Sequence, residues 1–299
     1  MINQTSGVAL WALTQAVDYM WAGIVGAIVT GLFGGDQSPA ARHSDRNLAL
    51  ACLALGVTTV VVMHARELTW FAVLGDRVPA CKRKVLSPRT RSYLLSTTGI
   101  SMASFFTLYK AGIMRYTPPS FTAAFWLEAF APFYAVLVLR DVCFLAPLHK
   151  AMHASPVLYR LLHKTHHEVG SDAQALHAFH IDAADLVVEN VGAPLLLLAG
   201  QRLLGRLPLL HWLTALLLTM HDGALHSVNP FSAMYFNPLL DWLLKANVNH
   251  QLHHALNAGH LLFVPWSHVF RKGRQTDCRR YNQVFKTTFE FPGLGGGDL

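Results

Sequence analysis

Charged side chains are scarce in this chain, where Asp, Glu, Lys and Arg make up only 14% of the 299 residues. Soluble domains usually carry about 25%, so the composition argues against an ordinary cytosolic enzyme. The sequence also lacks a C-x-x-C pair, and its four cysteines lie far apart, which argues against a disulfide scaffold and a thiolate zinc site. No internal repeat and no Gly-rich phosphate loop is present. The hydrophobic content of 53% excludes a disordered chain, because disorder requires low hydrophobicity and high net charge.

Long apolar runs take the place of the missing charge. Stretches that approach or reach the ~20 residues of a transmembrane helix lie at 8–33, 48–63, 93–109, 121–139, 186–200 and 207–220. Buried core helices of a large soluble protein are the alternative, but so many runs together favour a membrane. We predict an all-α integral membrane protein with about four core transmembrane helices, or one more at the N-terminus. The first run lacks a basic flank and is too long for a signal peptide, so we expect a retained span or an interfacial helix.

The positive charge, +7 in total, gathers beside these runs. Lys and Arg crowd residues 77–91 and 271–286, and the positive-inside rule makes both segments cytoplasmic. Arg202 and Arg206 do not fit this orientation, because they would lie at the far end of the hairpin 186–220. The conflict disappears if the hairpin does not fully cross the bilayer. Because the positive charge lies in membrane-flanking loops without interleaved aromatic residues, we expect no binding to nucleic acid.

Histidine is the most unusual component, because 15 of the 17 histidines lie between residues 149 and 268. Every dense group falls just beyond a predicted membrane exit, on the predicted cytoplasmic side. His149-Lys-Ala-Met-His153 places two rings on one face of a helix. The pattern H-x-x-H-H occurs twice, at 163–167 and 250–254, and its spacing predicts all three rings on one side of a helix. Further pairs lie between these motifs, at positions 177 and 180 and at positions 221 and 226.

Bound metal explains this density of histidines. A lone H-x-x-x-H is more often two satisfied core or surface histidines, but three motifs together reverse that expectation. Clustered imidazoles would become like charges below pH ~6.5 and gain nothing in return without a metal. Imidazole suits iron, zinc, copper or nickel, and the scarcity of thiolates and carboxylates argues against soft metals, magnesium and calcium. One zinc ion needs at most four histidines, so eight suffice for two metals and suggest redox or oxygen chemistry, although spacing alone leaves iron and zinc open.

The motifs HKAMH, HKTHH and HQLHH, in this order and next to membrane helices, resemble those of the membrane fatty-acid hydroxylase and sterol desaturase superfamily of non-haem di-iron oxidoreductases. The resemblance covers roughly residues 121–270. It implies two irons held by histidines on the cytoplasmic face of a four-helix transmembrane core, with O2 as co-substrate. The metal ligands that it implies are His149, His153, His163, His166, His167, His250, His253 and His254.

Three further ligands follow from the same resemblance. His180 stands where the family often has a His-Pro-x-Glu element, although the sequence here is His180-Ile-Asp182. His226, followed by Ser227, matches the family histidine after the last membrane hairpin, and His221 fits an alternative arrangement seen in lipid hydroxylases. Weaker candidates are His177, His260 and His268.

Carboxylates near these histidines could orient the imidazoles, because a metal-bound imidazole usually donates its other ring N–H to a carboxylate or carbonyl. We predict this role first for Asp222, which adjoins one candidate ligand and precedes another by four residues. Asp182 and Asn249 are further candidates. For Asp182, Asp185, Asp222 and Glu168 alike, the alternative is a solvated surface.

The resemblance implies an O2-dependent hydroxylase or desaturase, and a site that opens toward the bilayer leads us to expect an apolar, lipid-like substrate: a sterol, fatty acyl chain, sphingolipid or terpenoid. We expect a separate electron donor, cytochrome b5-like or a ferredoxin with its reductase, docked by charge at the loop 77–91 or the tail near 271–280. The alternative for the loop is topology determination and binding to anionic lipid. A zinc-dependent membrane lipid hydrolase and a non-catalytic metal-binding membrane protein stay open as other functions.

The same pattern predicts how the chain is divided and where it resides. The predicted regions are N-terminal transmembrane helices with a basic loop (1–120), a catalytic region (121–270) and a basic, partly disordered tail (271–299). The expected location is the endoplasmic reticulum membrane in a eukaryote or the inner membrane in a bacterium, with the active site facing the cytoplasm.

Overall fold

Helices make up most of the described part of the protein. The computed structural model describes residues 7–33, 45–110, 114–115, 140, 144–189, 210–231, 246–257 and 271–291. β-Structure in these ranges is limited to one parallel pair of two-residue strands, β1 (Met114–Arg115) and β2 (Leu210–His211). The predicted all-α class is therefore confirmed for the described residues. The predicted span 121–139 and the weaker ligand candidates His260 and His268 lie outside them.

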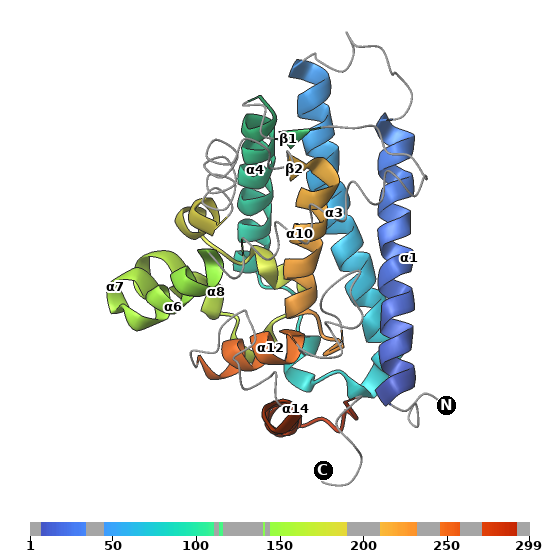
Figure 1. The fold of residues 1–299 in the computed structure, drawn as a ribbon, viewed down its shortest axis with the longest axis vertical. Helices are drawn as coiled ribbons and strands as arrows, with labels where there is room; N and C mark the ends of the chain where they lie inside the picture. The colour runs from blue at the N-terminus through green and yellow to red at the C-terminus, as the bar shows by residue number, and fades with distance from the viewer. Residues whose placement is uncertain are drawn as a thin grey trace.

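Four helices lie alongside one another: α1 (Gly7–Phe33), α3 (Asp45–Leu74), α4 (Pro88–Lys110) and α10 (Trp212–His226) (Figure 1). α3 is central, because it contacts the other three. At ~1.5 Å per residue, α1, α3 and α4 extend about 35–45 Å, which exceeds the ~30 Å hydrocarbon core of a bilayer. Within the described ranges, one helical stretch, Cys52–Arg77, is long and apolar enough by composition to cross a membrane.

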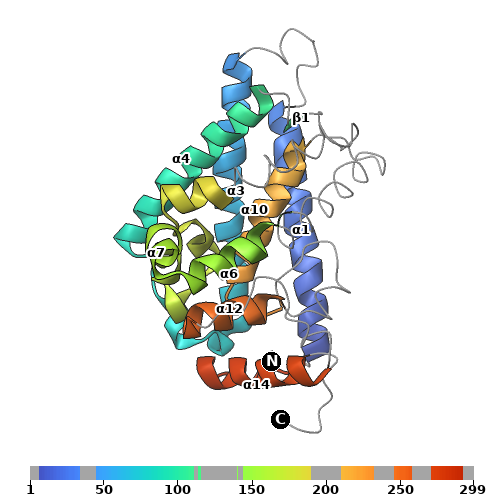
Figure 2. The ribbon, with the colours of Figure 1, turned by 60° about the vertical axis from the view of Figure 1, so that its left-hand side comes forward.

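A layer of shorter helices lies toward one end of these four, in the lower half of Figure 1. A near-continuous run is made of α6 (Ala146–Ala154), α7 (Pro156–Leu158), the π-helical turn η5 (Tyr159–His163) and α8 (Lys164–His167). Two later helices, α12 (Ala246–Leu256) and α14 (Arg271–Phe285), pack on each other and run across the axis of α1 (Figure 2). The 3-10 turns that complete the layer are η2 (Gly75–Arg77), η3 (Ala80–Arg83), η6 (Gly170–Asp172) and η7 (Ala175–Phe179).

The first part of the basic C-terminal tail forms α14, and the last residues of the tail, 292–299, lie outside the described ranges. Tyr281 and Phe285 are buried on α14 and belong to one apolar cluster with Trp70 of α3 and Leu252 of α12. At the start of α1, a side chain at Gly7 would overlap the backbone of residue 290. The buried aromatic rings of α14 therefore hold the tail against the short-helix layer. The two ends of the described chain meet at this place.

A buried ion pair joins α1 to α3. The Arg66 guanidinium donates two hydrogen bonds to the Asp18 carboxylate, at 2.5 Å from Nε and 3.0 Å from Nη2. Arg66 is fully buried and Asp18 nearly so. A bidentate pair in such surroundings fixes the rotation of both helices, because either charge would be costly without the other.

Removing one partner of this pair should therefore destabilise the protein more than removing both. We expect Asp18→Ala to lower the free energy of unfolding by about 3–5 kcal/mol, because it leaves the Arg66 charge buried without its carboxylate. The double variant Asp18→Leu/Arg66→Leu should recover most of that loss. Denaturant titration in detergent, followed by circular dichroism, measures both; equal losses would show that the pair does not align the helices.

Candidate metal centre

Nine of the eleven predicted metal ligands converge into two adjacent groups. In each group the candidate ligand atoms all lie within 4.8 Å of one another. The first, called site A, comprises His149, His153, His163, His167 and His253. The second, called site B, comprises His166, His226, His250 and His254. Four separate helical elements therefore supply these rings: α6, the η5–α8 run, α10 and α12.

The two H-x-x-H-H motifs divide their rings between the sites, whereas the sequence analysis expected three rings on one side. His163 and His167 point into site A, and His166 points into site B. In the later motif the two sites are exchanged: His250 and His254 lie in site B, and His253 lies in site A. At ~100° per helical residue, the first and fifth positions lie about 40° apart, but the fourth is about 100° from the fifth. Each motif can therefore face two neighbouring metals.

Ring nitrogens in site B lie at the spacing of ligands around one metal ion. The Nε2 atom of His226 is 3.3 Å from that of His166, 3.1 Å from that of His254 and 2.9 Å from that of His250. Adjacent nitrogens bound at ~2.0–2.1 Å would lie about 3.0–3.4 Å apart. A neutral imidazole nitrogen carries one proton or one lone pair, so hydrogen bonds cannot satisfy all these contacts. A shared cation can.

Site A shows the same crowding of nitrogen atoms. The Nε2 atoms of His149 and His253 are 2.7 Å apart, and those of His163 and His167 are 3.1 Å apart. The Nε2 atom of His153, another member of site A, is buried and has no hydrogen-bond partner in the described part of the chain. Buried, unsatisfied donors or acceptors cost about 1–3 kcal/mol each. The residues present therefore fit two bound metal ions.

Burial keeps these imidazoles neutral. It lowers the pKa of His226 to about 4, and it lowers the pKa of His149 and His250 well below the usual value, with neighbouring imidazoles adding to the effect. Desolvation disfavours the charged ring, and a second positive ring nearby disfavours it further. At neutral pH the rings therefore offer lone pairs, which is the form that binds metal.

Two ligands receive a second contact that selects their tautomer. The Nδ1–H of His226 donates to the backbone carbonyl of Asp222 at 2.7 Å, which leaves Nε2 free to face site B. In site A, His163 Nδ1 lies 3.3 Å from the carboxylate of the fully buried Asp185. Such contacts fix ring orientation and raise ligand basicity. Asp222 thus contacts a ligand, as predicted, but through its main chain.

The predicted orienting residues occupy different places. The carboxylate of Asp222 forms a bidentate pair with Arg140, at 2.7 and 3.1 Å, and Arg140 follows directly on the predicted span 121–139. Asp182 accepts a hydrogen bond from the backbone N–H of Asp185 at 3.2 Å and so caps the helical residues 183–189. Asn249 is buried beside His250 on α12. Asp185, which was ranked below Asp222, contacts a candidate ligand ring through its carboxyl group.

His180 and His221 belong to neither site. His180 shares a 3.0 Å hydrogen bond with the Thr90 hydroxyl and lies 3.8 Å from the Glu168 carboxylate, beside the N-terminal end of α4. His221 is buried on α10 but outside both groups. His177, a weaker candidate, accepts a 2.9 Å hydrogen bond from the Gln174 backbone N–H, and thereby caps η7.

A buried carboxylate that the sequence analysis missed holds the end of α10. Glu67 on α3 accepts hydrogen bonds from the Ser227 hydroxyl at 2.7 Å and from the backbone N–H groups of Val228 and Ala175 at 2.9 and 3.1 Å. It therefore secures the turn that directly follows His226. The isolated acid near the end of a long apolar helix was the signal for it in the sequence.

The same turn is tied to α12. The Gln251 amide donates to the carbonyl of Ser227, and the Asn247 amide donates to the carbonyl of Ala224. These bonds satisfy carbonyls at the C-terminal end of α10, where the helix itself provides no donors. They also set the position of His226 relative to His250. α10 lies close to α3 at this point, as the position of Gly223 shows: any side chain there would overlap Met63.

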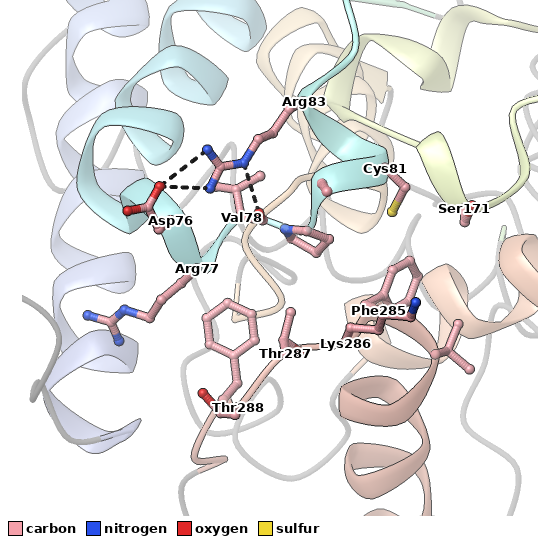
Figure 3. Close-up of a pocket in the computed structure, with 14 residues that line it drawn as sticks. Asp76, Arg77, Val78, Cys81, Arg83, Ser171, Phe285, Lys286, Thr287 and Thr288 are labelled. Carbon is pink, nitrogen blue, oxygen red and sulfur yellow. Dashed lines mark hydrogen bonds and ion pairs between the residues drawn. The ribbon is translucent and has the colours of Figure 1, made fainter.

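A separate cavity of about 630 Å³ lies where the loop after α3 meets the C-terminal end of α14 (Figure 3). Its lining includes Asp76, Arg83 and Phe289 but no member of site A or site B. Figure 3 shows the Arg83 guanidinium directed at the Asp76 carboxylate within this lining. The cavity is therefore distinct from the metal centre.

Replacing Glu67 by Gln should empty site B before site A. An amide has one acceptor oxygen, so at least one of the three buried donors loses its partner at a cost of about 1–3 kcal/mol, and the turn after His226 loosens. We expect metal content to fall from about two ions per chain towards one. Elemental analysis measures this, with Glu290→Gln, an exposed acid, as the control. Equal loss from both sites would contradict the assignment.

Comparison of the chain with protein-family models, with curated proteins and with solved structures found no match. The two histidine sites and the helices that hold them are therefore the features that bear on its function.

Proposed function

We propose that this protein is a membrane-bound di-iron oxygenase that activates O2 to hydroxylate or desaturate an apolar, lipid-like substrate. The observation that carries the proposal is the pair of adjacent, buried, all-histidine groups at one end of long apolar helices. The overall change is R–H + O2 + 2 e⁻ + 2 H⁺ → R–OH + H2O, or the corresponding loss of two hydrogens. The electrons come from a separate carrier.

The number of ligands supports iron over zinc. Catalytic zinc sites have three protein ligands and an open fourth position, whereas site A brings five histidines together. Five imidazoles suit a six-coordinate redox metal with one open position, and the four of site B leave two. Bound iron would supply the electron transfer and Lewis acidity with which O2 is activated.

The chain's own residues bind the metals, set their geometry and exclude water. All but one of the nine histidines are buried, and Asp185 and the Asp222 carbonyl hold two rings in their ligating tautomer. Hydrogen bonds from the Gln251 and Asn247 amides of α12 to backbone carbonyls at the C-terminal end of α10 hold these two helices together. This rigidity suits a reaction in which substrate position decides between hydroxylation and desaturation.

Exposed apolar side chains on the long helices support a membrane location. α3 exposes Leu50, Leu53, Val57, Val61 and Leu68, with exposed fractions of 46–57%. α1 and α4 add others, among them Val8, Met20 and Leu95. Such a surface is costly in water and favourable in lipid. In this arrangement the basic loop after α3 and the histidine layer lie at the same end of the helices, which we propose faces the cytoplasm.

Purified protein should bind about two irons per chain and convert a component of a total lipid extract in the presence of O2 and reductant. We expect a product that carries one ¹⁸O atom from ¹⁸O2, or that is lighter by two hydrogens, in mass spectrometry. His166→Ala and His253→Ala, one in each site, should reduce iron content and lower turnover at least about 100-fold while the helical content stays unchanged.

The same assay distinguishes the alternatives. Turnover without O2 by a zinc-loaded, iron-free sample would establish a hydrolase instead. Full metal loading without turnover of any lipid in the extract would favour a non-catalytic metal-binding protein. Retained activity in both histidine variants would remove the metal centre from the mechanism.

A further inference from the structure

We propose that the surface formed by α6, α7, η5 and α8 docks an acidic one-electron carrier protein, which reduces the centre through the exposed edge of site A. The inference rests on the proposed function, since only a redox centre needs such a partner. It assigns the docking site to a segment different from the two that the sequence analysis favoured.

Site A has one edge that reaches solvent. His153 is half-buried, whereas the other four histidines of site A and all four of site B are buried. Tyr159 covers the same edge, with its ring centroid 5.4 Å from that of His153 and 6.0 Å from that of His167. A carrier that contacts this edge comes as near to a metal ligand as the described surface allows.

The surface around this edge is positive. Residues 142–167 contain no Asp or Glu, and Lys150, Arg160 and Lys164 are exposed. In the described part of the chain none of these three cations has an acidic partner. Their charge is therefore available to a partner of the opposite sign.

Apolar side chains lie among these cations. Val157 is 54% exposed and Leu161 is 63% exposed. Residues 157, 160, 161 and 164 of this run are exposed, whereas His163, His166 and His167 are buried. Exposed apolar contacts surrounded by charge are typical of transient protein interfaces.

The basic loop 77–91 has fewer charges to offer than its sequence suggests. Lys84 pairs with Asp172 at 2.6 Å, Arg89 pairs with Glu168 at 2.8 Å, and Arg83 pairs with Asp76 at 3.4 Å (Figure 3). Lys82 is buried and donates to the Ala173 carbonyl at 2.8 Å. Lys82, Lys84 and Arg89 hold the loop against the histidine layer, and Arg83 is paired within the loop, so these four cations are not free to attract a carrier.

Helix α14 is separated from the metal centre. Its Tyr281 hydroxyl donates to Gln251 of α12, so α12 stands between α14 and the ligand rings. Arg279 and Arg280 are exposed on α14, but a carrier bound there would face α12 rather than a ligand. Among the described residues, the α6–α8 surface is the one that combines cations without acidic partners with a partly exposed candidate ligand.

The redox step balances with a one-electron carrier. Each turnover consumes two electrons and two protons with one O2, so two reduced carriers must dock in turn and leave oxidised. Fast exchange of carriers requires weak binding together with a high association rate. Long-range charge attraction provides the high association rate. Salt screens such attraction, with a Debye length of ~10 Å at 0.1 M.

The test is the rate at which a reduced soluble cytochrome b5 domain, an acidic one-electron carrier, reduces the iron-loaded full-length protein. The triple variant Lys150→Gln/Arg160→Gln/Lys164→Gln should lower the second-order rate at least about tenfold at low salt and weaken its dependence on ionic strength. Iron content and reduction by dithionite with a neutral mediator should stay unchanged.

The matched control removes three positive charges elsewhere, in Arg91→Gln/Arg279→Gln/Arg280→Gln, and should slow reduction by less than about twofold. Equal slowing in both variants, or slowing in the control alone, would overturn the assignment. So would an effect that appears in nanodiscs of anionic phospholipid and vanishes in neutral ones, because the surface would then bind lipid. If dithionite drives O2-dependent turnover while both triples accept electrons normally, the proposed function stands and the docking surface is wrong.

Discussion

The arrangement of this protein depends on one constraint: nine neutral imidazoles face one another in two buried groups, where hydrogen bonds cannot satisfy them. In site B the Nε2 atom of His226 lies within 3.3 Å of three others. A bound cation would turn this unfavourable crowding into coordination. The positions of α6, α10, α12 and the η5–α8 run follow from the need to present the rings together.

Buried polar contacts around the sites hold that geometry against apolar helices that could otherwise slide or rotate. Glu67 and Gln251 secure the turn after His226, and the Asp18–Arg66 pair aligns α1 with α3. Each of these groups would be costly to bury alone. They specify one register of the helices, which supports a centre whose ligands come from residues more than a hundred positions apart.

Much of the centre could be predicted from the sequence, because ligand spacing along a helix is a local property. The three motifs identified His149, His166 and His253 together with the other box histidines, and His226, which was ranked above His221, lies in site B. The division of each H-x-x-H-H motif was not predicted, since it depends on how α6, α10 and the two motif-bearing segments meet in space. His180 was placed by resemblance alone, and the structure pairs it with Thr90 instead.

Long-range contacts were beyond the reach of sequence patterns. Glu67 lies about 160 residues from the turn that it secures, and nothing local marks which acid will meet which backbone N–H. The cations of the loop 77–91 predicted a charged surface, but Asp172 and Glu168 neutralise two of them from the histidine layer. Helix class and apolar runs were predictable, because they depend on composition and periodicity within one segment.

The most direct test of the two-site centre is X-ray diffraction from crystals of the iron-loaded protein, with anomalous difference maps measured at the iron absorption edge. We predict two peaks, one among the five histidines of site A and one among the four of site B, each about 2.0–2.2 Å from its ring nitrogens. A single peak, peaks elsewhere, or rings turned away from one another in the loaded protein would contradict the account.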